Sequence, residues 1–258
     1  MMGLFWIERG TGMPVVLLHG GFLDHTMWDD QIPVLSERHR VIAYDARGHG
    51  RSPNADGPYR LTDDLAALLR HLGTGPAVLV GVSMGAGLAV DTALEHPDLV
   101  RALVVTGAGT SEPCFEDPWT LRALAAWHGA MAAGDLEGSV EGHLTLGIGP
   151  GRDPAGLDPE VVRRLRAMAR GTMSKHAVGE PDHVVPVTDT WRRIGSIRVP
   201  VLAVHGALDS PGHIAMAERL ATTAAGGRSV TIENAGHYPN MERPDEYNRV
   251  LEDFLASL

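Results

Sequence analysis

The chain has 258 residues with 44% hydrophobic and 21% charged side chains, which is enough for one large domain with a buried core. Its 22 basic and 32 acidic residues give a net charge of −10, so we expect neither nucleic acid nor an anionic membrane as its main partner, because both favour cationic surfaces. The single cysteine, Cys114, excludes an intrachain disulfide, and the N-terminus lacks a secretory signal pattern, so we expect a cytoplasmic protein.

Short apolar runs alternate with helical patterns along the chain, which is typical of a parallel sheet flanked by helices. Runs of valine, leucine and isoleucine without polar alternation are typical of strands buried on both faces. An edge strand is expected at Leu4–Glu8, followed by strands at Val15–Leu18, Val41–Tyr44, Ala77–Val82, Ala102–Thr106, Val201–His205 and Val230–Glu233. The residues therefore predict an α/β fold.

Several of the intervening segments carry the end signals of helices. Thr62, followed by two aspartates, predicts an N-cap, and Gly73 predicts the left-handed residue that ends the same helix. A second helix is expected from Met84 to about Glu95. Two later helices are expected to begin near the Ser210–Pro211 pair and near Pro244, because proline favours the first helical turn.

The alternation breaks between about Ser111 and Trp191. This stretch has helical patterns at Trp119–Ala133 and Pro159–Arg170, separated by Gly- and Pro-rich loops such as Gly147–Pro154, and it carries no strand pattern. We therefore predict an α/β core made of residues 1–110 and 191–258, into which residues 111–190 are inserted as a helical cap.

The strongest chemical signal is the sequence Gly81-Val-Ser-Met-Gly85, in which Ser83 lies between a predicted buried strand and a predicted helix. Such a turn is sharp, and the two glycines remove Cβ atoms that would clash there. It exposes the serine hydroxyl at a helix N-terminus, where developing negative charge is favoured. These features predict Ser83 as a catalytic nucleophile.

A serine hydroxyl needs a base to remove its proton, and the base needs an acid to orient it. Among the 13 histidines, His237 follows the last predicted strand, and Asp209 follows the strand before it. Both therefore belong to the carboxyl edge of the sheet, where sites form in open α/β folds. No carboxylate follows the strand ending at Thr106 in the segment Gly107–Thr110, so Asp209 is the predicted acid.

Acyl transfer also needs donors for the oxyanion of the tetrahedral intermediate, and backbone N–H groups commonly supply them. The segment His19-Gly-Gly-Phe22 directly follows a predicted strand, and its glycines allow the backbone to turn its amides toward the site. We predict that the backbone N–H groups of Phe22 and Met84 form the oxyanion hole.

Five motifs together resemble the α/β-hydrolase superfamily over almost the whole chain. They are His19–Phe22, Asp45–Ser52, Gly81–Gly85, Val204–Asp209 and Asn234–His237. The resemblance is to compact bacterial members with a helical cap: esterases, enol-lactonases, carbon–carbon bond hydrolases and cofactor-free haloperoxidase-like enzymes. It implies a mostly parallel eight-stranded sheet with the cap between the sixth and seventh strands, and it implies that segment 45–52, His19 and His49 are structural.

The expected activity is hydrolysis of an ester, lactone, thioester or activated ketone of a small molecule, without a metal or other cofactor. Alternatives are a lyase or a perhydrolase that uses the same triad, and a ligand-binding protein without catalysis. A serine at position 83 disfavours the dehalogenases and epoxide hydrolases of this fold, which use a carboxylate nucleophile. The substrate, the oligomeric state and the roles of His128, His143, His176 and His183 stay open.

Residues of the predicted cap are candidates for the substrate pocket. The candidates, with Gly21 from the core, are Trp119, Trp127, Met131, Met168 and Met173. Arg163, Arg164, Arg166 and Arg170 form a basic run on a predicted cap helix, which is either a solvated face or a contact for a carboxylate-bearing substrate. His205 and His213 are assigned to a strand end and a helix start.

Overall fold

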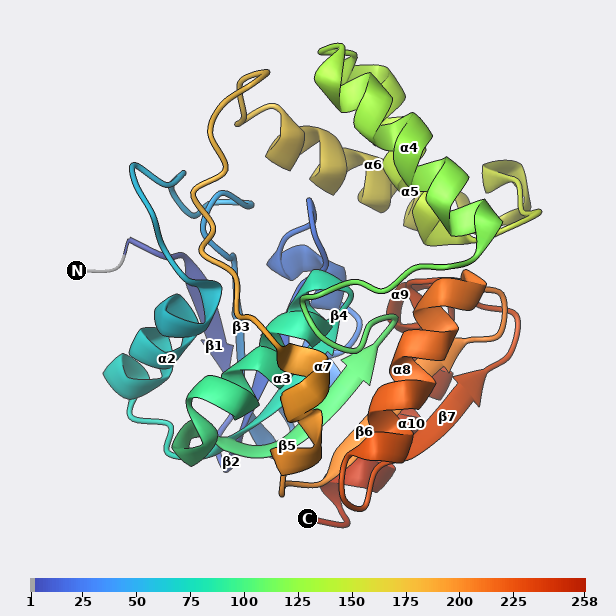
Figure 1. Cartoon of the computed structure of the whole chain (residues 1–258). Coiled ribbons are helices and arrows are strands. Elements are labelled where there is room, and N and C mark those ends of the chain that lie inside the picture. Colours follow the sequence, from blue (N-terminus) through green and yellow to red (C-terminus); the bar gives the residue numbers. More distant parts are fainter. Residues whose placement is uncertain (1–2) are drawn as a thin grey trace.

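A computed structural model describes residues 3–258 as a mostly parallel sheet covered by helices on both faces (Figure 1). The strands lie in the order β1-β3-β2-β4-β5-β6-β7, and only β1 runs antiparallel to its neighbour. Their bounds are β1 Trp6–Arg9, β2 Met13–Leu18, β3 His39–Tyr44, β4 Ala77–Val82, β5 Val100–Thr106, β6 Val201–Gly206 and β7 Arg228–Ile232. The predicted α/β fold and its strands are thereby confirmed.

The sheet has seven strands within residues 3–258, so the eight strands implied by the family resemblance are a wrong prediction. The segment before β1 bonds to a loop and not to a strand. The backbone N–H of Phe5 donates to Ser52 Oγ at 2.9 Å, and the carbonyl of Phe5 accepts from the Asp45 amide at 2.9 Å. The second bond continues the antiparallel register of β1 on β3, in which Trp6 is opposite Tyr44, so this segment extends β1 and forms no further strand.

Ten α-helices are described in residues 3–258. Their bounds are α1 Ile32–Leu35, α2 Leu61–Leu72, α3 Met84–Glu95, α4 Pro118–Ala132, α5 Leu136–Ile148, α6 Pro159–Met173, α7 Thr190–Arg193, α8 Pro211–Thr223, α9 Pro239–Glu242 and α10 Pro244–Leu255. No helix in this part of the chain is long and apolar enough to cross a bilayer.

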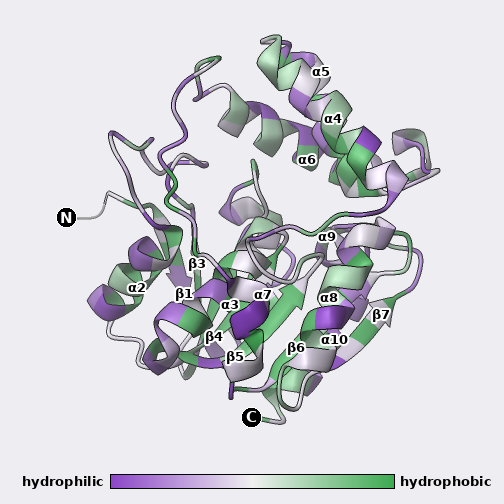
Figure 2. Ribbon diagram, in the orientation of Figure 1, coloured by the Kyte–Doolittle hydropathy of each residue, from purple (hydrophilic) through white to green (hydrophobic). Residues whose placement is uncertain are grey.

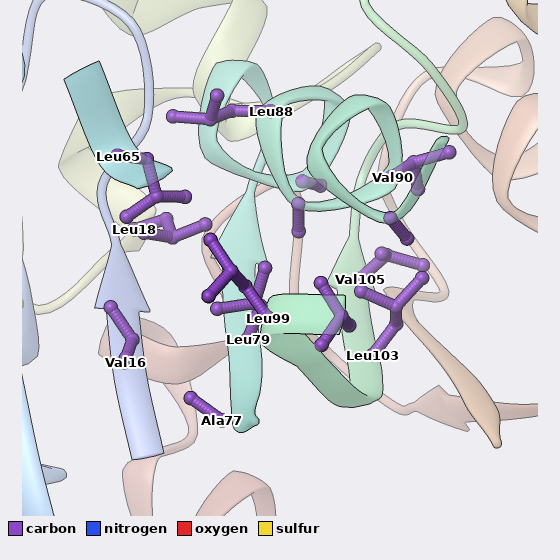
Figure 3. Close-up of a cluster of buried hydrophobic side chains, with 14 of the residues drawn as sticks. Val16, Leu18, Leu65, Ala77, Leu79, Leu88, Val90, Leu99, Leu103 and Val105 are labelled. Carbon is purple, nitrogen blue, oxygen red and sulfur yellow. The ribbon is translucent and has the colours of Figure 1, made fainter. Parts of the chain in front are cut away.

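Two apolar clusters hold the sheet between its helices. Figure 3 shows the first, in which Leu18 and Leu79 of the sheet pack against Leu65 of α2 and Leu88 of α3. The second lies on the opposite face and includes Leu251 of α10. Figure 2 shows strands β5 and β6 largely in green, as buried apolar strands require, while the helices carry both hydrophobic and hydrophilic residues.

The structure confirms most of the predicted helix ends. Gly73 ends α2 with a φ of 59°, and Ser210 caps α8 by accepting the His213 backbone N–H. The predicted N-cap at Thr62 is wrong, because α2 begins at Leu61 with Arg60 as its N-cap. Thr62 lies inside the first turn with its side chain buried, so packing against the core decides its position.

Three longer helices, α4, α5 and α6, lie between β5 and β6 in the sequence and stand together on the side toward which β5 points (Figure 1). Two of them correspond to the predicted helical segments. The sequence pattern does not predict helix α5, whose last turn contains Gly147, and it wrongly assigns Gly147 to a loop. Three glycines in this helix lower its intrinsic helix propensity, so the sequence pattern alone does not indicate a helix.

Candidate active site

Ser83 lies on the tight turn between β4 and α3, half-buried, with φ 54° and ψ −116°. A positive φ is strained for a residue other than glycine, so the surrounding packing must hold it. A Cβ on Gly81 would come within 2.2 Å of the Gly85 carbonyl oxygen, and one on Gly85 within 2.1 Å of the Leu18 carbonyl oxygen. The two glycines of the motif therefore allow the backbone approach that the turn requires.

Asp209 and His237 follow β6 and β7, and their side chains are hydrogen-bonded. His237 Nδ1 donates to Asp209 Oδ2 at 2.8 Å, with both side chains buried. Backbone bonds join the two loops, since the Leu208 amide donates to the Ala235 carbonyl at 2.9 Å. Burial alone would raise the pKa of Asp209, but the neighbouring His237 and His213 hold that pKa well below its usual value. The acid is therefore ionised beside the imidazole.

The end of β5 brings the serine turn and the aspartate–histidine pair together. The Ser83 amide donates to the Thr106 carbonyl at 2.7 Å. A Cβ on the next residue, Gly107, would meet His237 Cε1 at 2.5 Å and Asp209 Oδ2 at 3.3 Å. The three predicted triad residues thus surround the carboxyl end of one strand. Within residues 3–258, Ser83 Oγ makes no hydrogen bond to another protein group.

The predicted oxyanion donors lie beside the serine turn. Phe22 has a left-handed φ of 58°, and a Cβ on Gly21 would lie 3.7 Å from Met84 Cβ. Met84 is the first residue of α3, so its backbone N–H has no acceptor within the helix. In the described part of the chain, neither this amide nor that of Phe22 donates to another protein group. Both amides are consequently free to bind an anion.

A cavity of about 830 Å³ is lined in part by Phe22 and Met84, the residues that carry these amides, whereas Ser83, Asp209 and His237 are not among its lining residues. Its apolar wall includes Phe22, Met84, Met131, Leu136, Met173 and Val184. Of the predicted pocket residues, Gly21, Met131 and Met173 line it, whereas Trp119, Trp127 and Met168 are not among its lining residues. Met168 is buried in the second core cluster, and Trp127 packs edge-on against the Phe22 ring at 5.3 Å between centroids.

Two further histidines, whose contacts the sequence does not predict, lie close to this site. His143 of α5 is buried, and its Nε2 is 3.1 Å from the hydroxyl of Tyr238, the residue after His237. Burial lowers the pKa of His143 to about 4, so this side chain is neutral at neutral pH. His49 lines the cavity, and burial lowers its pKa to about 3. The structural role that the resemblance implies for His49 stays a prediction.

His19 and the loop of segment 45–52 are joined by hydrogen bonds. His19 Nε2 accepts the Ala46 amide at 2.9 Å, and Asp45 accepts the amides of His25 and Arg51, each at 2.8 Å. These buried bonds satisfy the polar groups of a tight loop, which burial would otherwise penalise. Their contacts agree with the structural role expected for His19 and Asp45.

Two groups of side chains within residues 3–258 gather possible metal ligands within 4.8 Å of one another. They are Asp209 with His213 and His237, and Asp24 with His25 and Asp45. In each group an aspartate is hydrogen-bonded to a histidine, at 2.8 Å for His237 on Asp209 and for His25 on Asp45. Internal partners therefore already engage these donors. The absence of a metal stays a prediction.

The basic run on α6 is paired with carboxylates. Arg163 pairs with Glu160, Arg164 with Asp30, Arg166 with Glu141 and Arg170 with Glu137. The described lining of the cavity includes none of these arginines. The structure thus favours a solvated, ion-paired face over a contact for a substrate carboxylate.

A parallel sheet with a strained serine after β4, and an aspartate and a histidine after two later strands, defines an α/β hydrolase. The chain belongs to the alpha/beta hydrolase fold family, whose model matches residues 13–244. It is an enzyme of the α/β-hydrolase type.

Two kinds of relative illustrate this family. The pimeloyl-(acyl-carrier protein) methyl ester esterase of Aeromonas hydrophila is 30% identical over 97% of this chain and 98% of its own. Among solved structures, a thermophilic esterase from Thermogutta terrifontis has a TM-score of 0.79 at 27% identity, covering 98% of this chain and 93% of its own. The enol-lactonase of Burkholderia xenovorans has a TM-score of 0.75 at 26% identity, covering 98% and 96%.

Proposed function

We propose that this enzyme hydrolyses carboxylic esters of small molecules with Ser83 as nucleophile, His237 as general base and Asp209 as the orienting acid. One observation carries the proposal. His237 Nδ1 donates to the buried Asp209 carboxylate at 2.8 Å, beside a serine on a strained strand-to-helix turn. This bond fixes the tautomer in which Nε2 carries the lone pair that a general base needs.

In the acylation step, His237 Nε2 takes the proton of Ser83 Oγ as that oxygen attacks the ester carbonyl. The carbonyl π electrons move to oxygen, and the amides of Phe22 and Met84 stabilise the resulting oxyanion. When the carbonyl re-forms, the bond to the leaving alkoxy oxygen breaks, and that oxygen receives the proton from His237. Asp209 stabilises the intermediate imidazolium throughout.

In the deacylation step, water replaces the alcohol. His237 takes one proton of the water as its oxygen attacks the acyl carbon. The second tetrahedral intermediate collapses, the bond to Ser83 Oγ breaks, and the serine receives the proton back. The products are a carboxylic acid and an alcohol, and no cofactor takes part.

We infer that residues 111–190 act as a cap over this chemistry and provide the acyl pocket. Met131, Leu136 and Met173 come from this segment and line the cavity of about 830 Å³. An apolar wall of this kind favours an apolar acyl group, because burying it releases ordered water and adds dispersion contacts.

Hydrolysis of p-nitrophenyl esters of increasing acyl length tests the proposal. We expect activity in the wild type and a fall of about a thousandfold or more in kcat for Ser83→Ala, as for loss of a triad nucleophile. Ser229→Ala, on the exposed face of edge strand β7, is the matched control and should retain activity. Equal activity of the wild type and Ser83→Ala would overturn the assignment.

A further inference from the structure

Asp209 is hydrogen-bonded to two histidines, one on each carboxylate oxygen. His237 occupies Oδ2 at 2.8 Å, while Nδ1 of His213, in the first turn of α8, lies 3.2 Å from Oδ1. The two imidazole rings lie nearly face to face, with centroids 4.0 Å apart and an interplanar angle of 32°. The mechanism proposed above gives His213 no role, although this residue touches both the acid and the base.

The structure holds His213 firmly in this position. Ser210 caps α8 by accepting the His213 backbone N–H at 3.2 Å, and its Oγ is 2.9 Å from His213 Nδ1. The Phe115 ring packs edge-on against the imidazole at 5.0 Å between centroids. Only 8% of His213 is exposed, so protein groups surround most of this residue.

The charges around His213 fix its protonation. The ionisable groups that face it are Asp209 and His237 from the two loops and Asp117 at the start of α4. Burial, followed by the neighbouring His237, lowers the pKa of His213, so the ring is neutral at neutral pH. The Ser210 backbone N–H also donates to Asp209 Oδ1, at 2.6 Å. A bare Nδ1 would set its lone pair against the carboxylate, so the neutral ring carries its proton on Nδ1 and shares it between Asp209 Oδ1 and Ser210 Oγ.

We propose that His213 is a positioning residue that donates to Asp209 Oδ1, holds Oδ2 toward His237 and sets the pH range in which His237 acts as a base. This inference rests on the proposed triad. A carboxylate that accepts two imidazole N–H bonds shares its negative charge between them, so it stabilises the His237 imidazolium less strongly. The general base is therefore free at a lower pH than it would be with Asp209 bonded to His237 alone.

A pair of variants separates the hydrogen bond from the ring. His213→Phe keeps an aromatic ring beside His237 but removes the donor, whereas His213→Asn keeps a donor near the Nδ1 position and removes the ring. For His213→Phe we expect kcat to fall about tenfold with little change in KM, and the acidic midpoint of the kcat/KM profile to rise by about one pH unit. His213→Asn should restore both values to near those of the wild type.

A wild-type measurement keeps the test informative where a variant does not fold. Proton NMR should show, among its downfield imidazole N–H signals, two that are absent in Asp209→Ala, and one of these two should also be absent in His213→Phe and His213→Asn. The proposal is overturned if only one downfield signal depends on Asp209, if the pH midpoint is unchanged in folded His213→Phe, or if the Phe and Asn variants are equally impaired. A purely structural role would lower the unfolding temperature without moving the midpoint.

Failure of the triad proposal gives a different result. In that case the wild type would show no hydrolysis that depends on Ser83, whatever the residue at position 213. The two downfield signals would still report whether His213 donates to Asp209. The two proposals are therefore tested by separate measurements.

Discussion

The carbonyl oxygen of Gly147, in the last turn of α5, accepts the backbone N–H of His237 at 2.9 Å. The inserted helix is thus bonded directly to the proposed general base. A Cβ on Gly147 would come within 2.4 Å of the Tyr238 ring, so the close approach of helix and loop depends on glycine at this position. Movement of α5 away from the core would break this bond and disturb the loop that carries His237.

Substitution of Gly147 by alanine should therefore impair catalysis. The added methyl group would displace the Tyr238 ring and the adjacent His237, and a misplacement of about 1 Å can reduce the rate by roughly a hundredfold. Gly171→Ala is the matched control, because Gly171 lies in helix α6 and an added Cβ would meet nothing within 4 Å. Measured kcat/KM should fall in the first variant only, and an active Gly147→Ala would contradict the coupling.

Glu242 links a second part of the insertion to the same loop. It accepts the Gly236 amide at 2.9 Å and pairs with Arg152 at 2.7 Å, and its side chain is only 6% exposed. Glu242→Gln would leave the Arg152 charge without its carboxylate in a partly buried place. We expect the free energy of unfolding to fall by about 3 kcal/mol, as for a broken buried ion pair.

Urea denaturation measures that loss, and an exposed pair provides the control. Glu160 and Arg163 pair on the solvent face of α6, where water screens the interaction. Glu160→Gln should leave the free energy of unfolding almost unchanged. Similar losses in the two variants would show that burial of the Arg152–Glu242 pair adds nothing to stability.

Asp91 of α3 should make stability depend on pH. Its Oδ2 accepts the Ser111 hydroxyl, but Oδ1 is buried without a partner in the described residues, and burial raises the pKa of Asp91 to about 6. The folded state therefore holds this proton more tightly than the unfolded state. The stabilisation is complete below the unfolded pKa near 4 and is lost as the pH rises through about 6.

Comparison with Asp91→Asn isolates this effect, because asparagine does not ionise there. The free energy of unfolding of the variant relative to the wild type should increase by about 2 kcal/mol between pH 4 and pH 7. Urea unfolding at several pH values measures this difference and removes the contributions of the other carboxylates. A difference independent of pH would mean that Asp91 is not protonated more readily in the folded protein.

Filling the cavity should change the acyl-length preference. Met131 lines the cavity from α4, and Met131→Trp would add bulk to the apolar wall. We expect kcat/KM for long acyl esters to fall about tenfold, while short esters are hydrolysed as before, because losing roughly 1.4 kcal/mol of binding costs that factor. Leu121→Trp, exposed on the same helix, should leave the profile unchanged. A uniform loss across all lengths would count against Met131 as part of an acyl pocket.

The sequence by itself determined the sheet and the serine turn, because their signals are local. Continuous apolar runs predict buried strands wherever they occur, and glycines at 81 and 85 flank Ser83 within five residues. The order of Ser83, Asp209 and His237 along the chain placed all three at one edge, since parallel strands end on the same side.

Only the tertiary structure decided how the insertion meets this edge. Helix α5 is not predicted from the sequence because it contains glycines, and two of these are required by contacts with distant residues. A Cβ on Gly142 would come within 3.0 Å of Trp127, and a Cβ on Gly147 would come within 2.4 Å of Tyr238. For the same reason, no sequence pattern distinguished His143 or His213 among the 13 histidines. Their positions depend on contacts between segments far apart in the chain, and these contacts form only when the sheet brings those segments together.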